Sequence, residues 1–145
     1  MTEAQALRSL IVERTMPHSP EKVWRVLTEP AFIDRWLMKN DFELRVGHHF
    51  NFRAQLMYGW NGVTDCEVLE IVPNERLVYS WNASGEQAVD GLKTVVTWTL
   101  TRRHDGTSVR MEQSGFRPED EGGYRSMGGG WPSMLAKMEE VASHA

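Results

Sequence analysis

Apolar and polar positions alternate along most of the chain, which predicts a series of β-strands. The first run covers residues 9–16, and further runs follow at 42–46, 50–56, 63–72, 77–81, 96–100 and 109–113. Turn signals lie between them at 59–62, 73–75 and 105–106, and a small, polar loop is expected at 83–92. Consecutive short strands joined by tight turns predict an antiparallel meander.

Two helix-start signals follow the first strand. Ser19 is placed to cap free amides, Pro20 suits the first helical position, and Glu21 faces the positive end of the helix dipole. Pro30 ends this helix and begins a second short one, in which Trp36 is expected to point inward.

The last quarter of the chain predicts one long helix, because apolar residues recur at spacings of three and four from Tyr124 to Val141. Glycines at 122, 123 and 128–130, together with Pro132, interrupt the stripe. An interior Gly costs about 1 kcal/mol relative to Ala, and an interior Pro costs about 3 kcal/mol. We therefore expect a break near residues 128–132, with the firm helix starting close to Pro132.

The resulting element order is that of an α+β protein: a strand, two short helices, about six more antiparallel strands and a long final helix. A strongly bent sheet cannot bury its concave face on itself. The C-terminal helix is the element left to cover that face. We therefore expect a pocket between sheet and helix.

Length and charge narrow the function classes. A chain of 145 residues and 16.6 kDa suits one domain, and 41% hydrophobic residues suit a packed core. The net charge is −4, and the sequence contains no cluster of basic residues, so a nucleic-acid partner is not expected. The sequence has no apolar stretch of about 20 residues and no secretion-signal pattern, so we expect no membrane insertion and a cytoplasmic location. The single Cys66 cannot form an internal disulfide.

The candidate ligand-binding residues are the bulky or adaptable side chains that the sheet and the final helix turn toward each other. From the sheet and its flanks these are Trp36, Phe52, Trp81, Trp98, Met111 and Gln113, and from the helix Met127, Trp131, Met134 and Met138. The alternative is that these side chains fill the core completely. Gln113 is the most informative, because burying its amide without a partner costs about 1–3 kcal/mol. It must therefore meet a protein group, a water or a ligand.

Catalytic and metal-binding patterns are weak, and we expect no catalytic residue, metal or cofactor. His48 and His49 are adjacent on a strand, so they point to opposite faces and cannot chelate one ion together. Asp65 and Glu67 share a strand face, which suits acid–base work at a pocket mouth but equally a solvated strand end. The glycines at 128–130 lack the context of a phosphate loop and suggest either a flexible gate or helix fraying.

Four ordered segments carry a family resemblance: LIVERTMPHSPEKVWRVLTEPAFIDRWL at 10–37, EVLEIVPNERLVYSW at 67–81, DGTSVRMEQSGF at 105–116 and GWPSMLAKM at 130–138. From about residue 8 to residue 142 the chain resembles the activator of heat-shock-protein-90 ATPase homologue family, within the START-like (SRPBCC) superfamily. The resemblance implies a single START-like domain over 1–145 with its core at about 8–142. It also implies a helix-grip fold, in which a bent antiparallel sheet of about six to seven strands wraps around the long C-terminal helix.

The resemblance leaves the function open, because the superfamily includes lipid carriers, hormone receptors and aromatic polyketide cyclases. Leu37, Cys66 and Pro132 depart from the family's usual residues, so no relative's ligand preference is carried over. We rank a small hydrophobic or amphipathic ligand first, interaction with a chaperone second, and a cyclase-like or hydrolase-like enzyme third. Both a monomer and a homodimer remain compatible with the sequence.

Overall fold

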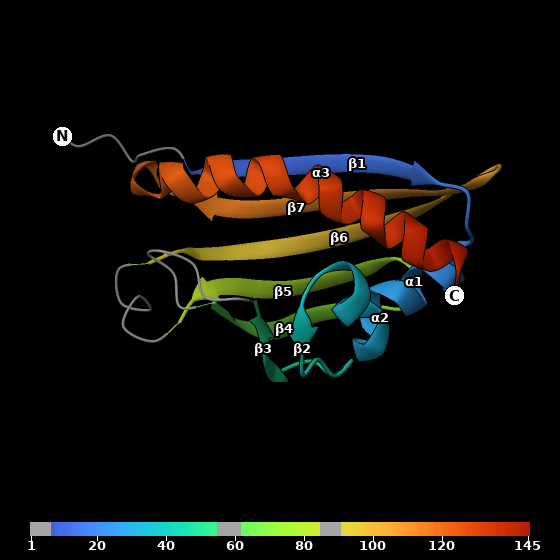
Figure 1. Cartoon of the computed structure of the whole chain (residues 1–145), viewed down its shortest axis with the longest axis horizontal. Coiled ribbons are helices and arrows are strands. Elements are labelled where there is room, and N and C mark those ends of the chain that lie inside the picture. Colours follow the sequence, from blue (N-terminus) through green and yellow to red (C-terminus); the bar gives the residue numbers. More distant parts are fainter. Residues whose placement is uncertain (1–6, 55–61, 85–90) are drawn as a thin grey trace.

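Seven antiparallel strands form one open sheet in the computed structural model, which describes residues 7–54, 62–84 and 91–145 (Figure 1). The strands are β1 (Arg8–Met16), β2 (Lys39–Asn40), β3 (His49–Arg53), β4 (Val63–Val72), β5 (Arg76–Ala83), β6 (Lys93–Arg103) and β7 (Gly106–Phe116). Their order across the sheet is β1-β7-β6-β5-β4-β3-β2. The helices are α1 (Pro20–Thr28), α2 (Pro30–Trp36) and α3 (Glu121–Ser143), the last preceded by the 3-10 turn η2 (Pro118–Asp120).

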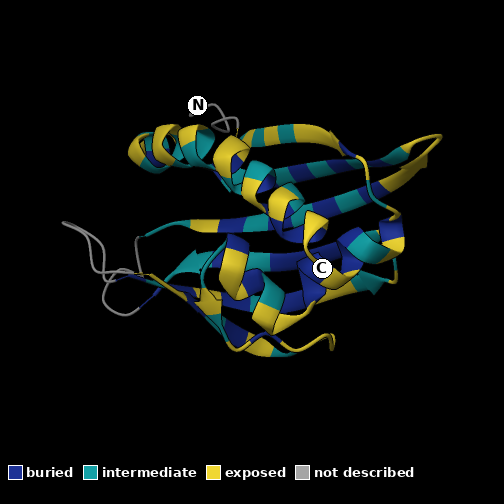
Figure 2. Cartoon of the chain, turned by 45° about the vertical axis from the view of Figure 1, so that its right-hand side comes forward, coloured by how far each residue is buried: buried dark blue, intermediate teal, exposed yellow. Residues whose placement is uncertain are grey.

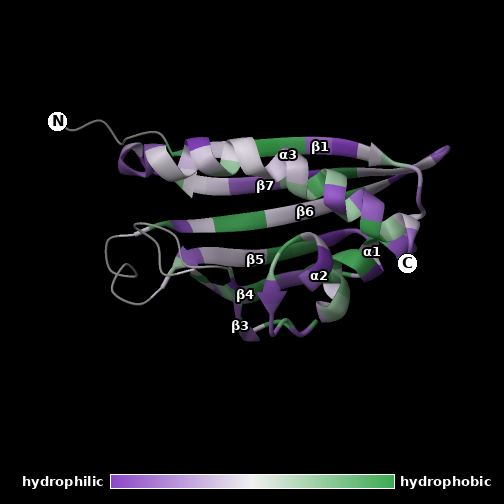
Figure 3. Ribbon diagram, in the orientation of Figure 1, coloured by the Kyte–Doolittle hydropathy of each residue, from purple (hydrophilic) through white to green (hydrophobic). Residues whose placement is uncertain are grey.

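The meander and the helix-grip arrangement predicted from the sequence are confirmed. Every paired strand is antiparallel, and β2 to β7 are neighbours in chain order, with β1 added beside β7. Helix α3 lies along β1 and β7 and ends above α1 (Figure 1). Exposed residues run along the outer side of α3, whereas buried residues lie along the strands (Figure 2). Hydrophobic and hydrophilic residues follow each other along those strands, as expected of a sheet with one face in the core (Figure 3).

Helix α1 begins as its sequence predicts. The Ser19 hydroxyl accepts a hydrogen bond from the Lys22 backbone N–H at 3.2 Å, and Pro20 occupies the first turn. The bond satisfies one of the amides that a helix start leaves without an intrahelical partner.

Replacing Ser19 with alanine is therefore expected to lower the free energy of unfolding by about 1 kcal/mol. Urea denaturation followed by circular dichroism measures this loss. Ser126→Ala is the control, because Ser126 lies exposed inside α3, where alanine favours the helix. Equal stability of the two variants would contradict a capping role for Ser19.

The strand expected at 42–46 is wrong. Local hydrogen bonds shape this segment: the Phe42 N–H donates to the Asn40 side-chain oxygen at 3.1 Å, and the Arg45 N–H donates to the Glu43 carbonyl. Short polar side chains that bond to nearby backbone compete with strand pairing. Phe42 is buried, but Leu44 and Val46 are 44% and 59% exposed.

The break expected at residues 128–132 is also wrong, because α3 continues through Pro132. Contacts at both ends hold the helix to the sheet. Arg8 bonds to Glu121 near the start of α3, and Arg14 bonds to Glu139 at 2.8 Å in its second half. Tertiary packing, more than intrinsic propensity, decides whether such a helix forms. The turn expected at 59–62 and the loop expected at 83–92 lie largely outside the described residues, as does Leu56 of the run at 50–56.

Asp120, at the end of η2, is held by Arg117. The guanidinium contributes bonds of 2.8 and 2.9 Å to the two carboxylate oxygens, and the Arg117 backbone N–H adds a third at 2.8 Å. Hydrogen bonds from the Arg117 side chain hold the pKa of Asp120 below its usual value, against the opposing effect of burial. A carboxyl with a lowered folded-state pKa stabilises the fold above its unfolded pKa and loses that contribution as the pH falls through the folded value.

Asp120→Asn is expected to cost about 1–2 kcal/mol of unfolding free energy at pH 7, because hydrogen bonds to a charged group are lost. The difference from the parent protein should shrink as the pH falls below about 4, where the parent carboxyl also becomes protonated. Urea denaturation between pH 7 and pH 2 measures the trend. Asp34→Asn, at an exposed position of α2, serves as control. A pH-independent difference would contradict the Arg117 pairing.

Candidate functional site

Five buried aromatic side chains form a continuous group over the concave face of the sheet, here called the aromatic layer: Trp36, Phe52, Trp81, Trp98 and Trp131. The Trp131 ring centroid lies 5.3 Å from that of Trp81 and 5.8 Å from that of Trp98. Trp36 contacts Trp98 at 5.6 Å, and Phe52 contacts Trp81 at 5.2 Å. Rings at these separations are in direct contact. The five rings therefore pack directly against one another, and their side chains fill the space between them.

The register of β5, β6 and β7 places the sheet's contribution to this layer. Trp98 pairs with Met111, Thr94 pairs with Trp81, and Val96 pairs with Gln113. Side chains directly opposite one another on neighbouring strands share a face. Since alternate residues of a strand also share a face, the inward side chains of the three strands adjoin one another beneath α3.

A chain of buried hydrogen bonds joins the aromatic layer to the sheet. The Trp131 indole N–H donates to the Gln113 side-chain oxygen at 2.8 Å. The Gln113 amide nitrogen donates to the Thr94 hydroxyl at 2.9 Å, and that hydroxyl donates to the Trp81 carbonyl at 2.7 Å. Gln113 thus finds its partners in protein groups, one of the three outcomes expected from its burial.

Sequence reasoning missed Thr94, although a signal for it exists. Thr94 lies two and four residues before Val96 and Trp98, which places it on the same inward face of β6. A hydroxyl on that face is the natural partner of the buried amide on the neighbouring strand. The structure makes it the link between Gln113 and the backbone of β5.

The indole groups of Trp98 and Trp36 also find protein partners. The Trp98 N–H donates to the Tyr79 hydroxyl at 2.9 Å, and the Trp36 N–H donates to the Val26 carbonyl at 3.0 Å. Burial raises the pKa of Tyr79 far above its ordinary value, so the phenol stays protonated at neutral pH. These bonds orient the rings without placing a charge among them.

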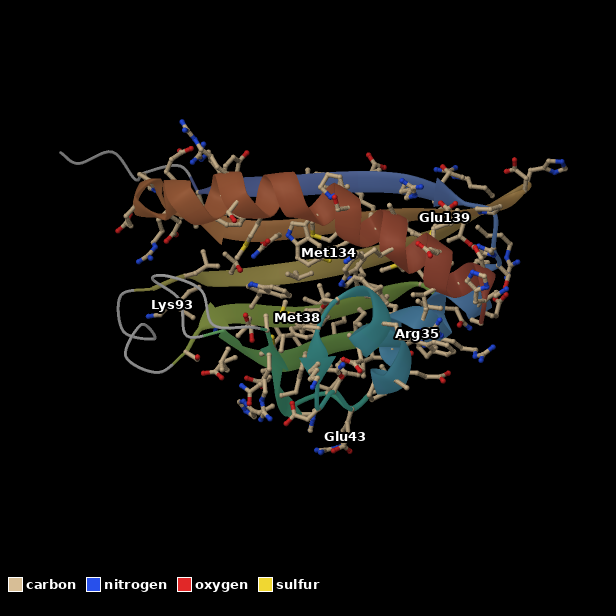
Figure 4. The ribbon with its side chains drawn as sticks, viewed as in Figure 1. Arg35, Met38, Glu43, Lys93, Met134 and Glu139 are labelled. Atoms are coloured by element: carbon tan, nitrogen blue, oxygen red, sulfur yellow. The ribbon has the colours of Figure 1, made fainter. Side chains whose placement is uncertain are left out.

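Four of the partly exposed apolar side chains that pack against the buried core containing the aromatic layer are here called the rim: Met38, Leu92, Met127 and Met134. Met134 projects from α3, and Met38 lies across the middle strands from it, after α2 (Figure 4). The other two predicted methionines, Met111 and Met138, are fully buried. The structure therefore brings the ten predicted residues to one region, eight of them buried and two at the rim. Ligand binding by them stays a prediction.

The four titratable residues singled out from the sequence, His48, His49, Asp65 and Glu67, do not belong to the aromatic layer. His49 is 79% exposed in its side chain, Asp65 is exposed and bonded to Asn51, and Glu67 approaches His49 at 3.8 Å. His48 packs parallel to Phe50, with 2° between the ring planes. Burial raises the pKa of the Cys66 thiol well above its ordinary value, so little of it is the reactive thiolate. In the described parts of the chain, no three His, Cys, Asp or Glu side chains are placed to hold a metal ion.

A surface groove of about 640 Å³ lies at another place, between the start of α1, the β4–β5 turn and β6. Three of its four charged side chains form ion pairs: Arg102 bonds to Glu21 at 2.6 Å, and Arg76 bonds to Glu70 at 3.1 Å. None of the ten predicted residues lines it. This groove therefore does not coincide with the predicted site.

No helix within the described ranges is long and apolar enough to cross a membrane.

Comparisons with known proteins agree with this architecture. The crystal structure of protein MLL2253 from Mesorhizobium loti is 47% identical, covers 95% of this chain and 98% of its own, and superposes with a TM-score of 0.86. The crystal structure of Mll3558 from Rhizobium loti is 25% identical, covers 96% of this chain and 99% of its own, and has a TM-score of 0.78.

CalU16 from Micromonospora echinospora is 24% identical, covers 94% of this chain and 77% of its own, and has a TM-score of 0.75, a likeness of fold. No curated protein matches the sequence. The family model described as "Activator of Hsp90 ATPase homolog 1-like protein" matches residues 17–143. The chain has the START-like (SRPBCC) helix-grip fold and belongs to the Activator of Hsp90 ATPase homolog 1-like family.

Proposed function

We propose that this protein binds a small apolar or amphipathic molecule on the concave face of the sheet, beside α3. The observation that carries the proposal is the rim: Met38, Leu92, Met127 and Met134 remain partly exposed while they pack against the buried core that contains the aromatic layer. Apolar side chains placed at such a boundary offer an incoming molecule both an entrance and a surface to bury.

The residue types of the rim favour a binding role. Methionine is unbranched and polarizable, so it adapts to ligands of different shape and packs well against aromatic rings. Three of the four rim residues are methionines, and they come from α3 and from the segment after α2. A molecule between these elements would gain apolar contacts from both.

The polar groups beneath the rim are few and already oriented. The Gln113 amide and the Thr94 hydroxyl are held by hydrogen bonds of 2.9 and 2.7 Å. A small number of fixed polar groups within an apolar site is typical of sites that orient one end of an amphipathic molecule. The enzyme alternative has no comparable support, because His49 and Asp65 are exposed, Glu67 is partly exposed, and His48 packs on Phe50, outside the aromatic layer.

Interaction with a chaperone is the second candidate, and one observation favours it besides the family's description. The loop after β2 lies against β4, where the Gly47 N–H donates to the Val68 carbonyl at 2.8 Å. Exposed apolar side chains flank this contact, with Val46 at 59% and Leu69 at 43% exposure. Exposed apolar residues that lie close together suit a protein partner. An unchanged chaperone ATPase rate in a purified assay would remove this candidate.

Native mass spectrometry of the freshly purified protein, compared with its denatured mass, tests the binding proposal. We expect an added mass of a few hundred daltons or, failing a co-purified molecule, complexes with added lauric acid or indole. Met134→Lys should reduce binding at least tenfold, because a charge at the rim must be desolvated. Ile11→Lys is the matched control, since Ile11 is 51% exposed on β1.

Two outcomes would overturn the proposal. One is a parent protein that carries no added mass and binds neither probe at millimolar concentration. The other is equal binding by the parent, Met134→Lys and Ile11→Lys, which would place the ligand away from the rim. Circular dichroism of both variants establishes that they remain folded.

A further inference from the structure

We propose that Trp131 is a displaceable internal occupant of the binding site, and that the site it fills takes a planar aromatic molecule bearing an N–H or O–H donor. This inference rests on the proposed function and specifies its ligand class. The observation behind it is a division of roles between two elements. The sheet supplies the walls and the hydrogen-bond acceptor around the Trp131 ring, whereas α3 supplies the ring itself.

The walls are aromatic and fixed to the sheet. Trp81 on β5 lies against the Trp131 ring at 60° between planes, and Trp98 on β6 meets it at 78°. Trp98 is itself held by its bond to Tyr79 and by its contact with Trp36. Tilted and edge-on contacts of this kind are favourable for any planar aromatic ring in the same position.

The acceptor, the Gln113 side-chain oxygen, is oriented by its own hydrogen bonds to the sheet, independently of the group that occupies the site. The Thr94 hydroxyl has one proton, which it donates to the Trp81 carbonyl, so toward Gln113 it can only accept. The Gln113 amide nitrogen must therefore face Thr94, and its carbonyl oxygen must face Trp131. An occupant of this site needs a donor, because a ring without one would leave that buried oxygen unpaired.

The segment of α3 around Trp131 is rich in residues that disfavour a helix. Gly128, Gly129 and Gly130 precede the tryptophan, and Pro132 follows it. Glycine and proline are the least favourable residues in a helix interior. Pro132 has no N–H, so the Gly128 carbonyl four residues earlier lacks its helical donor. A Cβ added at Gly129 or Gly130 would meet nothing within 4 Å, so packing does not require glycine at these two positions.

Anchors on both sides would keep α3 attached while this segment moves. Before it, Tyr124 packs on Phe116 at 5.2 Å between ring centroids and lies under the Arg8 guanidinium. After it, Leu135 and Met138 are fully buried. Displacement of Trp131 therefore needs only the central turns of α3 to open. Its rim neighbours Met127 and Met134 lie on these turns.

The first test uses the parent protein labelled with 5-fluorotryptophan, with the Trp131 fluorine resonance assigned from Trp131→Phe. Indole should bind at millimolar concentration and shift the Trp131 resonance toward that of a solvent-exposed ring, while the Trp24 resonance stays in place. Gly129→Ala should weaken indole binding severalfold, because it stabilises the helical, occupied form.

The second test opens the site with Trp131→Gly. This variant should bind indole at least tenfold more tightly than the parent protein does, because no displacement is needed. It should also prefer indole about tenfold over indene, a ring of the same shape without the N–H. Gln113→Met should abolish that preference by removing the acceptor.

The possible outcomes distinguish the displacement of Trp131 from the ligand-binding proposal on which it rests. If indole or lauric acid binds the parent protein at the rim without moving the Trp131 resonance, the displacement is overturned and the ligand-binding proposal stands. Equal affinity of Trp131→Gly for indole and indene would overturn the donor requirement. If no probe binds either the parent protein or Trp131→Gly, both proposals fail. The fluorine NMR test uses the parent protein, so it remains decisive even if Trp131→Gly does not fold.

Discussion

Truncation of Trp98 to alanine is expected to lower the free energy of unfolding by about 3–5 kcal/mol, the range for removing a large aromatic side chain from a packed core. Trp98 is fully buried and contacts both Trp36 and Trp131. Its removal also leaves the buried Tyr79 hydroxyl without the indole N–H that now donates to it. Urea denaturation monitored by circular dichroism measures the effect.

Trp98→Phe is the matched variant, because it keeps an aromatic ring in the layer but removes the indole N–H. Its expected cost is smaller, about 1–3 kcal/mol, from reduced volume and the lost hydrogen bond. A cost below 1 kcal/mol for Trp98→Ala would contradict the central position given to this ring.

Gly106→Ala is the second substitution with a large expected effect. A Cβ on Gly106 would lie 2.0 Å from the Met16 carbonyl oxygen and 3.1 Å from the Pro17 Cα, both backbone atoms. Neither can move aside as a flexible side chain would. The end of β1 must therefore separate from β7, where Met16 pairs with Thr107. We expect a loss of about 2–4 kcal/mol in the free energy of unfolding.

Gly129→Ala is the control for this experiment, because its Cβ would meet nothing within 4 Å and its position is helical. That substitution should stabilise the protein by about 0.5–1 kcal/mol. Chemical denaturation of the two variants should therefore give effects of opposite sign. A Gly106→Ala variant as stable as the parent protein would contradict the close approach of β1 and β7.

The alternation of apolar and polar residues was sufficient to predict the strands where one strand face is in the core. In β6, for example, Val96, Trp98 and Leu100 are buried, and the threonines between them are not. The same alternation failed at 42–46, because Leu44 and Val46 point away from the core. Bonds accepted by two side chains hold this segment: the Asn40 oxygen accepts from the nearby Phe42 N–H, and the Asp41 carboxylate accepts from the Asn51 N–H on β3. Alternation carries no information about such bonds.

The continuity of α3 could not be predicted from local preferences. Glycine and proline argue for a break at 128–132, and contacts more than a hundred residues apart in sequence, such as Arg14 with Glu139, oppose it. Local sequence also cannot say which way a side chain on this helix faces across the sheet. Strand parity predicted the inward position of Gln113, but its pairing with Trp131 depends on the rotation and height of α3 over β7.

Methionine-methyl NMR reports directly on whether a small apolar or amphipathic molecule binds beside α3. The protein carries eight methionines, among them three at the rim and the fully buried Met16 at the end of β1. Titration with lauric acid and with indole is predicted to shift the methyl resonances of Met38, Met127 and Met134 and to leave that of Met16 in place. Rim resonances that stay fixed at millimolar concentrations of both probes would contradict ligand binding beside α3.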